Sequence, residues 1–198
     1  MCLIVAIGHG QITNRKSLAF TSKTPGKTQQ FNYFAVNDKP GREKEIRYGD
    51  DIEGEPDRDS FYIVDLPGFG FAKVPEKQRQ EWAHFMKDYL SKRRTLKVVF
   101  HLVDGRHGPI DEDASIMKQV GENLPRNVAY VVILTKADKN VKTASRKQQG
   151  KVSIDVMNSL RDTMKANKVG NAPVIVTSSE TKLGRDDLWR YLRLAAEA

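Results

Sequence analysis

Three short polar stretches each follow an apolar run of the chain, and their side chains suit the binding of a purine nucleotide. The three stretches consist of Asp65, Leu66, Pro67 and Gly68; of Thr135, Lys136 and Asp138 around Ala137; and of Thr177, Ser178 and Ser179. A carboxylate such as Asp138 can accept two hydrogen bonds from N1–H and the 2-amino group of guanine, whereas adenine offers no such pair of donors. In a buried site the wrong base leaves that charge unpaired, so the discrimination is strong. The stretches predict a guanine site in which Lys136 lies along the purine face and backbone N–H groups of residues 177–179 meet the guanine oxygen.

The first of these stretches has the chemistry of a phosphate and magnesium site. Asp65 can hold Mg²⁺ through its water shell, and Gly68 lets a backbone N–H approach a terminal phosphate. Taken singly, such a stretch is more often a structural turn than a binding element. Three of them in order, each at the end of an apolar run, indicate a nucleotide site.

Apolar runs rich in β-branched and aromatic residues predict the strands that position these stretches. Nearly continuous runs are typical of a parallel sheet covered on both faces, whose ligands bind past the carboxyl ends of the strands. Helical patterns separate the runs, which indicates an α/β doubly wound sheet. The predicted strands are 61–65, 97–104, 128–134 and 173–179, with 29–36 at an edge and LIVAIG (3–8) able to form a first strand. The first predicted helix begins at Pro75 and has an apolar stripe of Trp82, Phe85, Met86, Tyr89 and Leu90. Three further helices are predicted over 112–123, 143–166 and 186–197.

The composition excludes several classes of protein. A chain of 198 residues with 39% hydrophobic and 29% charged residues suits one globular domain, 1–198. No apolar run approaches the ~20 residues of a membrane span, so we expect no membrane partner. Cys2 alone permits no internal disulfide, and we expect a cytoplasmic or organellar (plastid or mitochondrial) protein that is not secreted. Residues 37–59 carry nine acids and five bases with hardly any core-forming residue, and predict a solvated acidic loop insertion.

Five longer segments together are similar to the EngB (YihA) type of ribosome-biogenesis GTPase, in the Era-like class. They are TNRKSLAFTSKTPGKTQ, DLPGFGFAKVP, LVDGRHGP, LTKADK and TSSETKLGRDDLW, and the resemblance runs from about Ile12 to the C-terminus. It implies a P-loop GTPase-like, three-layer α/β/α fold with a mostly parallel sheet. It also implies a Mg²⁺-dependent GTP/GDP switch that acts as a monomer in assembly of the large ribosomal subunit, with that subunit or its rRNA, and not DNA, as partner.

The resemblance assigns roles to individual residues. Gly26, Lys27 and Thr28 belong to switch I, where the Thr28 hydroxyl binds Mg²⁺ and its backbone N–H meets the γ-phosphate. Asp65 and Gly68 are the switch II pair, Lys136 and Asp138 read guanine, and Ser178 and Ser179 complete the base pocket. Phe69 stands where many GTPases carry a glutamine that orients the attacking water, and a phenyl ring cannot do that. No catalytic residue is therefore assigned, and we expect slow hydrolysis or none.

IGHGQITNRK (7–16) lies where such a fold carries its phosphate-binding loop. That loop needs G-x-x-x-x-G-K-[ST] between a strand and a helix, so that its N–H groups wrap the phosphates. Only five residues separate Gly8 from Asn14, too few for the loop and the helix that follows it in this family. Residues 26–28 have the final letters of the pattern, but position 21 is Thr and not Gly. We therefore expect the P-loop and first helix to be missing and residues 1–11 to be an atypical N-terminus.

Two explanations for that difference stay open. The chain is either an incomplete product or a paralogue that lost nucleotide binding. The first predicts a GTP-binding protein with weakened affinity, and the second a nucleotide-free scaffold that binds the ribosome or RNA. The net charge of +8 and the basic segment 139–151, with five bases and no acid, allow an rRNA partner in either case.

Overall fold

The strands of the molecule form one twisted, mostly parallel sheet. The computed structural model describes residues 2–5, 32–36, 61–65, 76–93, 95–139 and 152–197. Within these ranges the strand order is β2-β3-β1-β4-β5-β6, and every neighbouring pair is parallel except β2 with β3. The strands are β1 (Cys2–Val5), β2 (Asn32–Val36), β3 (Phe61–Asp65), β4 (Leu96–Asp104), β5 (Ala129–Thr135) and β6 (Val174–Val176).

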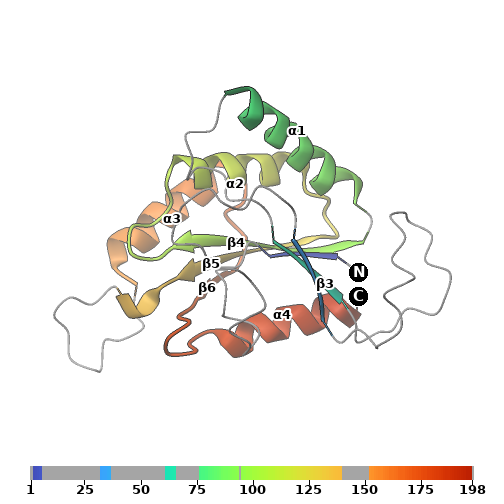
Figure 1. Cartoon of the computed structure of the whole chain (residues 1–198). Coiled ribbons are helices and arrows are strands. Elements are labelled where there is room, and N and C mark those ends of the chain that lie inside the picture. The colour runs from blue at the N-terminus through green and yellow to red at the C-terminus, as the bar shows by residue number, and fades with distance from the viewer. Residues whose placement is uncertain are drawn as a thin grey trace.

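Helices cover both faces of this sheet, as Figure 1 shows. Helices α1, α2 and α3 lie on one face and α4 lies on the other, which gives three layers. The helices are α1 (Glu76–Lys92), α2 (Asp111–Asn123), α3 (Ile154–Ala166) and α4 (Arg185–Glu197), with a short 3₁₀ helix η2 (Ala137–Lys139) after β5.

Alternation along the central strands fills both faces of the core. In β5, Val132 and Leu134 pack with the side of the sheet that holds α1 to α3, whereas Val131 and Ile133 pack on the α4 side. Both sets are nearly inaccessible to water, with exposed fractions of 0 to 2%. A strand buried on both faces needs apolar residues on both sides, which is why the run in the sequence is nearly continuous.

The structure confirms the predicted fold class and most of the predicted elements. The run LIVAIG does contribute the first strand, and β2 is the antiparallel edge strand expected for residues 29–36. Residues 37–59, where the acidic insertion was expected, lie outside the described residues.

Three details of the prediction were wrong. The helix expected over 143–166 begins at Ile154 in the described part of the chain, because the Ser153 side chain accepts a hydrogen bond from Val156 N–H and caps it there. Strand β6 ends at Val176 rather than continuing to 179. Phe85, expected in the apolar stripe of α1, is 43% exposed, because the side of α1 that faces the core is the one with Met86, Tyr89 and Leu90.

Candidate nucleotide-binding site

The carboxyl ends of β4, β5 and β6 bring the predicted base-binding stretches together. The registers of the parallel pairs align Asp104 with Thr135, and Leu134 with Val176. Residues 135–138 and 177–179, about forty positions apart in the sequence, therefore leave the same edge of the sheet on neighbouring strands. The sequence-based prediction of this juxtaposition holds in the structure.

A direct hydrogen bond joins the two stretches. Ser178 Oγ donates to Asp138 Oδ1 at 2.6 Å, and the same hydroxyl oxygen accepts from Thr181 N–H at 3.1 Å. The Asp138 side chain is 13% exposed, and Lys139 Nζ lies 3.7 Å from its Oδ2. A carboxylate held in this way presents acceptor oxygens in a fixed orientation at the carboxyl edge of the sheet.

The backbone around Thr177 is already engaged. Thr177 N–H donates to the Leu134 carbonyl at 2.7 Å, and Ser178 N–H donates to the Leu183 carbonyl at 3.2 Å. The first bond continues the parallel pairing of β6 with β5, whereas the second turns the chain away from β5, so β6 ends before Ser178. Among the backbone N–H groups of residues 177–179, that of Ser179 is the one with no hydrogen bond to another described residue.

Gly184 closes the loop that carries these serines. Its φ is +72°, and a Cβ atom there would stand 2.4 Å from the Val176 carbonyl oxygen. Any other residue would be strained and would clash with the strand end, so the close approach of this loop to β6 requires glycine.

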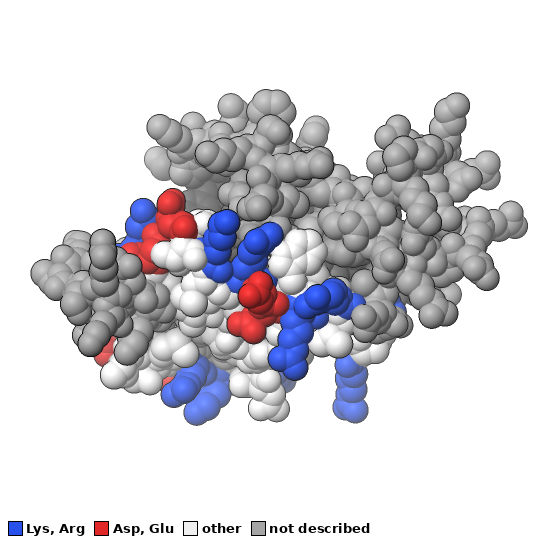
Figure 2. Space-filling model, turned by 90° about the horizontal axis from the view of Figure 1, so that it is seen from below, with Lys and Arg blue, Asp and Glu red and all other residues white. Residues whose placement is uncertain are grey.

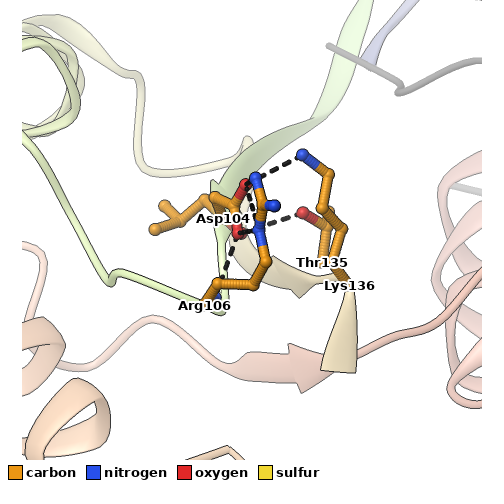
Figure 3. A network of polar contacts seen from close by, with 5 residues as sticks. Asp104, Arg106, Thr135 and Lys136 are labelled. Atoms are coloured by element: carbon orange, nitrogen blue, oxygen red, sulfur yellow. Dashed lines mark hydrogen bonds and ion pairs between the residues drawn. The ribbon is translucent and has the colours of Figure 1, made fainter. Parts of the chain in front are cut away.

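Lys136 leaves the same edge and turns toward β4 (Figure 3). Its φ of +58° ends strand β5 and starts η2, and Lys139 N–H donates back to the Lys136 carbonyl at 2.9 Å. Its Nζ lies 2.8 Å from Oδ2 of Asp104, which also receives the guanidinium of Arg106. We refer to Asp104, Arg106 and Lys136 as the edge cluster.

The edge cluster contains residues to which sequence reasoning assigned no role. Asp104 and Arg106 belong to LVDGRHGP, a strand followed directly by Asp-Gly-Arg. The sequence did contain a signal for this role, because Asp104 ends one predicted strand and Thr135 and Lys136 end the next. Neighbouring parallel strands end at the same edge of a sheet, so these residues could have been expected to lie close together.

A second polar group of three side chains, which we call the buried cluster, lies on the α2 side of the sheet. His101 Nδ1 lies 2.7 Å from the Tyr130 hydroxyl, and His101 Nε2 lies 3.0 Å from Asp113 Oδ1. Asp113 Oδ2 accepts the Ile110 N–H at 3.0 Å, at the start of α2. Burial, and then the charge of Asp113, raise the pKa of Tyr130 far above its ordinary value. The exposed fraction of His101 is 5%, so this histidine is part of the core.

The phosphate side of the predicted site lies largely outside the described residues. This holds for Gly26, Lys27 and Thr28, for Leu66, Pro67 and Gly68, and for Phe69. The backbone of Asp65 is described, and it ends β3 on the carboxyl side of the sheet, level with Phe100 of β4. In the described ranges no group of three His, Cys, Asp or Glu side chains is arranged to hold a metal ion.

Comparisons with known proteins agree with this architecture. The family described as 50S ribosome-binding GTPase matches residues 10–136. This match and the fold define the class of the chain as a P-loop GTPase-like α/β domain. The probable GTP-binding protein EngB of Symbiobacterium thermophilum is 34% identical over 198 residues, covering 92% of this chain and 78% of that protein. The protein of the same name from Geobacillus kaustophilus is 34% identical over 182 residues, covering 92% and 76%. The chain belongs to the EngB family.

Solved structures show the same fold at much lower sequence identity. Toc33 from Arabidopsis thaliana, as a dimerisation-deficient mutant, superposes with a TM-score of 0.58 at 12% identity, over 98% of this chain and 83% of that one. A structure of the chloroplast translocon components atToc33 and psToc159 superposes with a TM-score of 0.62 at 13% identity, over 98% of this chain and 82% of that one. These likenesses support the fold class alone. Within the described ranges, no helix has the length and apolar character to cross a membrane.

Proposed function

We propose that this protein binds GTP and GDP and acts as a Mg²⁺-dependent switch in assembly of the large ribosomal subunit. The observation that supports it best is the hydrogen bond between Asp138 and Ser178, which joins the two predicted base-binding stretches at one sheet edge. Its relatives are named as GTP-binding proteins, and the matching family is described as ribosome-binding. We expect the protein to act as a monomer.

In this proposal the base is recognised at its edge and at its face. Asp138 accepts N1–H and the 2-amino group of guanine, while Ser178 holds the carboxylate in place. The Ser179 N–H meets the guanine oxygen, since the N–H groups of Thr177 and Ser178 bond to the protein. Thr135 and Thr177 fix the two strand ends through hydroxyl bonds to the Val103 and Leu134 carbonyls.

The phosphates are proposed to lie over the ends of β1 and β3. Thr28 and Asp65 would hold Mg²⁺, which neutralises phosphate charge. Gly68 would approach the terminal phosphate, with Gly26, Lys27, Leu66 and Pro67 shaping the two switch segments. No G-x-x-x-x-G-K-[ST] pattern occurs in the sequence, so we expect weak affinity. With Phe69 in place of a water-orienting glutamine, we expect negligible turnover.

Among the described residues, charge does not single out the α4 face as the ribosomal contact. Figure 2 views the molecule from the side on which α4 lies, and basic and acidic side chains are interspersed there. On α4 itself, Arg190 and Arg193 share the helix with Asp186 and Asp187. The proposed rRNA contact therefore rests on the net charge of +8 and on the segment 139–151, not on this face.

The alternative is a nucleotide-free scaffold that binds the ribosome or RNA. The missing phosphate-loop pattern is the specific observation that favours it. A scaffold would keep the sheet and lose any need for Asp138 to face a ligand.

Equilibrium binding of a fluorescent GDP analogue separates the two functions. The proposal predicts saturable binding that Asp138→Ala abolishes and Asp162→Ala, an exposed acid on α3, leaves unchanged. Absence of binding together with intact affinity for rRNA would support the scaffold. A cooperative thermal melt of each variant excludes loss of fold as the cause.

A further inference from the structure

The carboxylate of Asp104 binds two cations from different parts of the chain. Its Oδ2 receives Lys136 Nζ at 2.8 Å and Arg106 Nη2 at 2.7 Å, and its Oδ1 receives Arg106 Nε at 2.9 Å. Figure 3 shows the three side chains converging where β4 and β5 end. Asp104 is thus the acid that contacts the lysine of the guanine-recognition stretch.

The turn after β4 fixes the orientation of that carboxylate. Gly108 N–H donates to the Asp104 carbonyl at 2.9 Å, and Arg106 N–H donates to Asp104 Oδ1 at 3.0 Å. Gly105 N–H in turn donates to the Thr135 carbonyl at 2.9 Å, which ties the turn to β5. The two-pronged guanidinium of Arg106 then leaves Oδ2 directed at Lys136, because an arginine fork binds a carboxylate in one plane.

Asp104 keeps its negative charge under all ordinary conditions. Partial burial raises the pKa of this carboxyl, but hydrogen bonds from Arg106 and Lys136 outweigh that effect, so its pKa lies well below the usual value. The anchor for Lys136 is therefore ionised at neutral pH.

We propose that Asp104 is a positioning residue for nucleotide binding, holding the Lys136 side chain where its stem lies along the purine face. This inference rests on the proposed function of the site. Arg106 assists by orienting the carboxylate. Neither residue touches the nucleotide in this account; both act through Lys136.

The energetic reason is the freedom of a lysine side chain. Lys136 is 49% exposed, and without Asp104 its stem would sample many rotamers. Ordering such a side chain only when the ligand arrives weakens binding by roughly 2- to 12-fold. Ion pairs this exposed contribute little to folding, so the effect should appear in binding rather than in stability.

A double-mutant cycle on GDP affinity tests whether Asp104 acts through Lys136. Asp104→Asn keeps the shape and removes the charge, and Lys136→Met keeps an unbranched stem and removes the ammonium. We expect each variant, and the double variant, to bind the fluorescent GDP analogue roughly fivefold more weakly than the unchanged chain. Additive losses, or unchanged affinity in Asp104→Asn, would overturn the proposal.

A second readout separates positioning from general damage to the site. Inosine diphosphate (IDP) lacks the 2-amino group but has the same purine face as GDP. Asp104→Asn should therefore weaken the binding of both nucleotides equally and leave the ratio of their affinities unchanged. Asp104→Glu, which restores the charge, should regain most of the affinity. A changed ratio in Asp104→Asn, or no rescue by glutamate, contradicts a role through the lysine stem.

The hold on Lys136 is measured separately in the nucleotide-free protein. Acetic anhydride should acetylate Lys136 several-fold faster in Asp104→Asn than in the unchanged chain. Peptide mass spectrometry measures the rate, with Lys118 on α2 as the internal reference. Equal rates would show that Asp104 does not hold the lysine. If the unchanged chain binds no GDP, the proposed function fails and with it the nucleotide role of Asp104; a difference in labelling would still establish the hold itself.

Discussion

The edge cluster and the buried cluster both join β4 to a neighbouring element through one carboxylate, yet their surroundings differ. In the edge cluster the side chains of Asp104, Arg106 and Lys136 are 27%, 41% and 49% exposed. In the buried cluster the exposed fractions are 5% for His101 and 15% for Asp113. One cluster faces the solvent at the carboxyl edge of the sheet, and the other is covered by α2.

This difference indicates a division of labour between the clusters. A buried polar group that loses its partner retains the full cost of desolvation, so the buried cluster should control stability. An exposed ion pair contributes at most about 1 kcal/mol to folding, so the edge cluster should be nearly neutral for stability and available to a ligand.

The largest effect on stability should follow from Tyr130→Phe. A carboxylate only accepts hydrogen bonds, so His101 Nε2 carries a proton and, in the neutral ring, Nδ1 accepts the Tyr130 O–H. Removing that hydroxyl leaves a buried nitrogen without its partner and should cost about 1–3 kcal/mol in the free energy of unfolding. Urea denaturation measures the loss, and an unchanged midpoint would show that the buried cluster does not support the fold.

Asp113→Asn should have the next largest effect. The amide can still accept one hydrogen bond, but it loses the charge that strengthens the contacts with His101 Nε2 and Ile110 N–H. We expect a loss of about 1 kcal/mol, measured by the same denaturation curves. A variant as stable as the unchanged chain would place the importance of the cluster in the tyrosine contact alone.

The pH dependence of the edge cluster should be small and confined to acid. Because the pKa of Asp104 is lowered in the folded protein, its contribution is present above the unfolded value of about 4 and is lost as pH falls below it. For groups this exposed, the amount should stay near or below about 1 kcal/mol. Comparing the unchanged chain with Asp104→Asn between pH 2 and pH 7 measures it; a difference that persists unchanged at pH 2 would contradict the assignment.

The smallest effect should come from Arg106→Met. This variant leaves the contact between Asp104 and Lys136 possible but removes the fork that orients the carboxylate. Side-chain ordering of this size predicts roughly twofold weaker GDP binding, with no measurable change in stability. Titration with the fluorescent GDP analogue tests this, and a loss as large as that of Asp138→Ala would mean that Arg106 itself contacts the nucleotide.

The sequence allowed prediction of those features that local patterns determine. The continuous apolar runs predict β4 and β5, since most positions of a strand covered on both faces are apolar. The stretches around Asp138 and Ser178 were recognisable because each follows such a run. The role of Asp104 was not, because its partner Lys136 is 32 positions away and only the strand register joins them. The early end of β6 likewise depends on a tertiary contact, the bond from Ser178 N–H to the Leu183 carbonyl. The exposure of Phe85 depends on which side of α1 faces the core.

The most direct test of the central claim is the nucleotide preference of Asp138→Asn. The amide introduced by this substitution can accept from N1–H and donate to the 2-oxo group of xanthine, so it matches xanthosine diphosphate where the carboxylate matches GDP. We predict that the substitution weakens the binding of GDP by about 100-fold and makes the protein prefer xanthosine diphosphate over GDP. Equal affinity of the unchanged chain for GDP and ADP, or a preference that Asp138→Asn leaves as it was, would contradict the account.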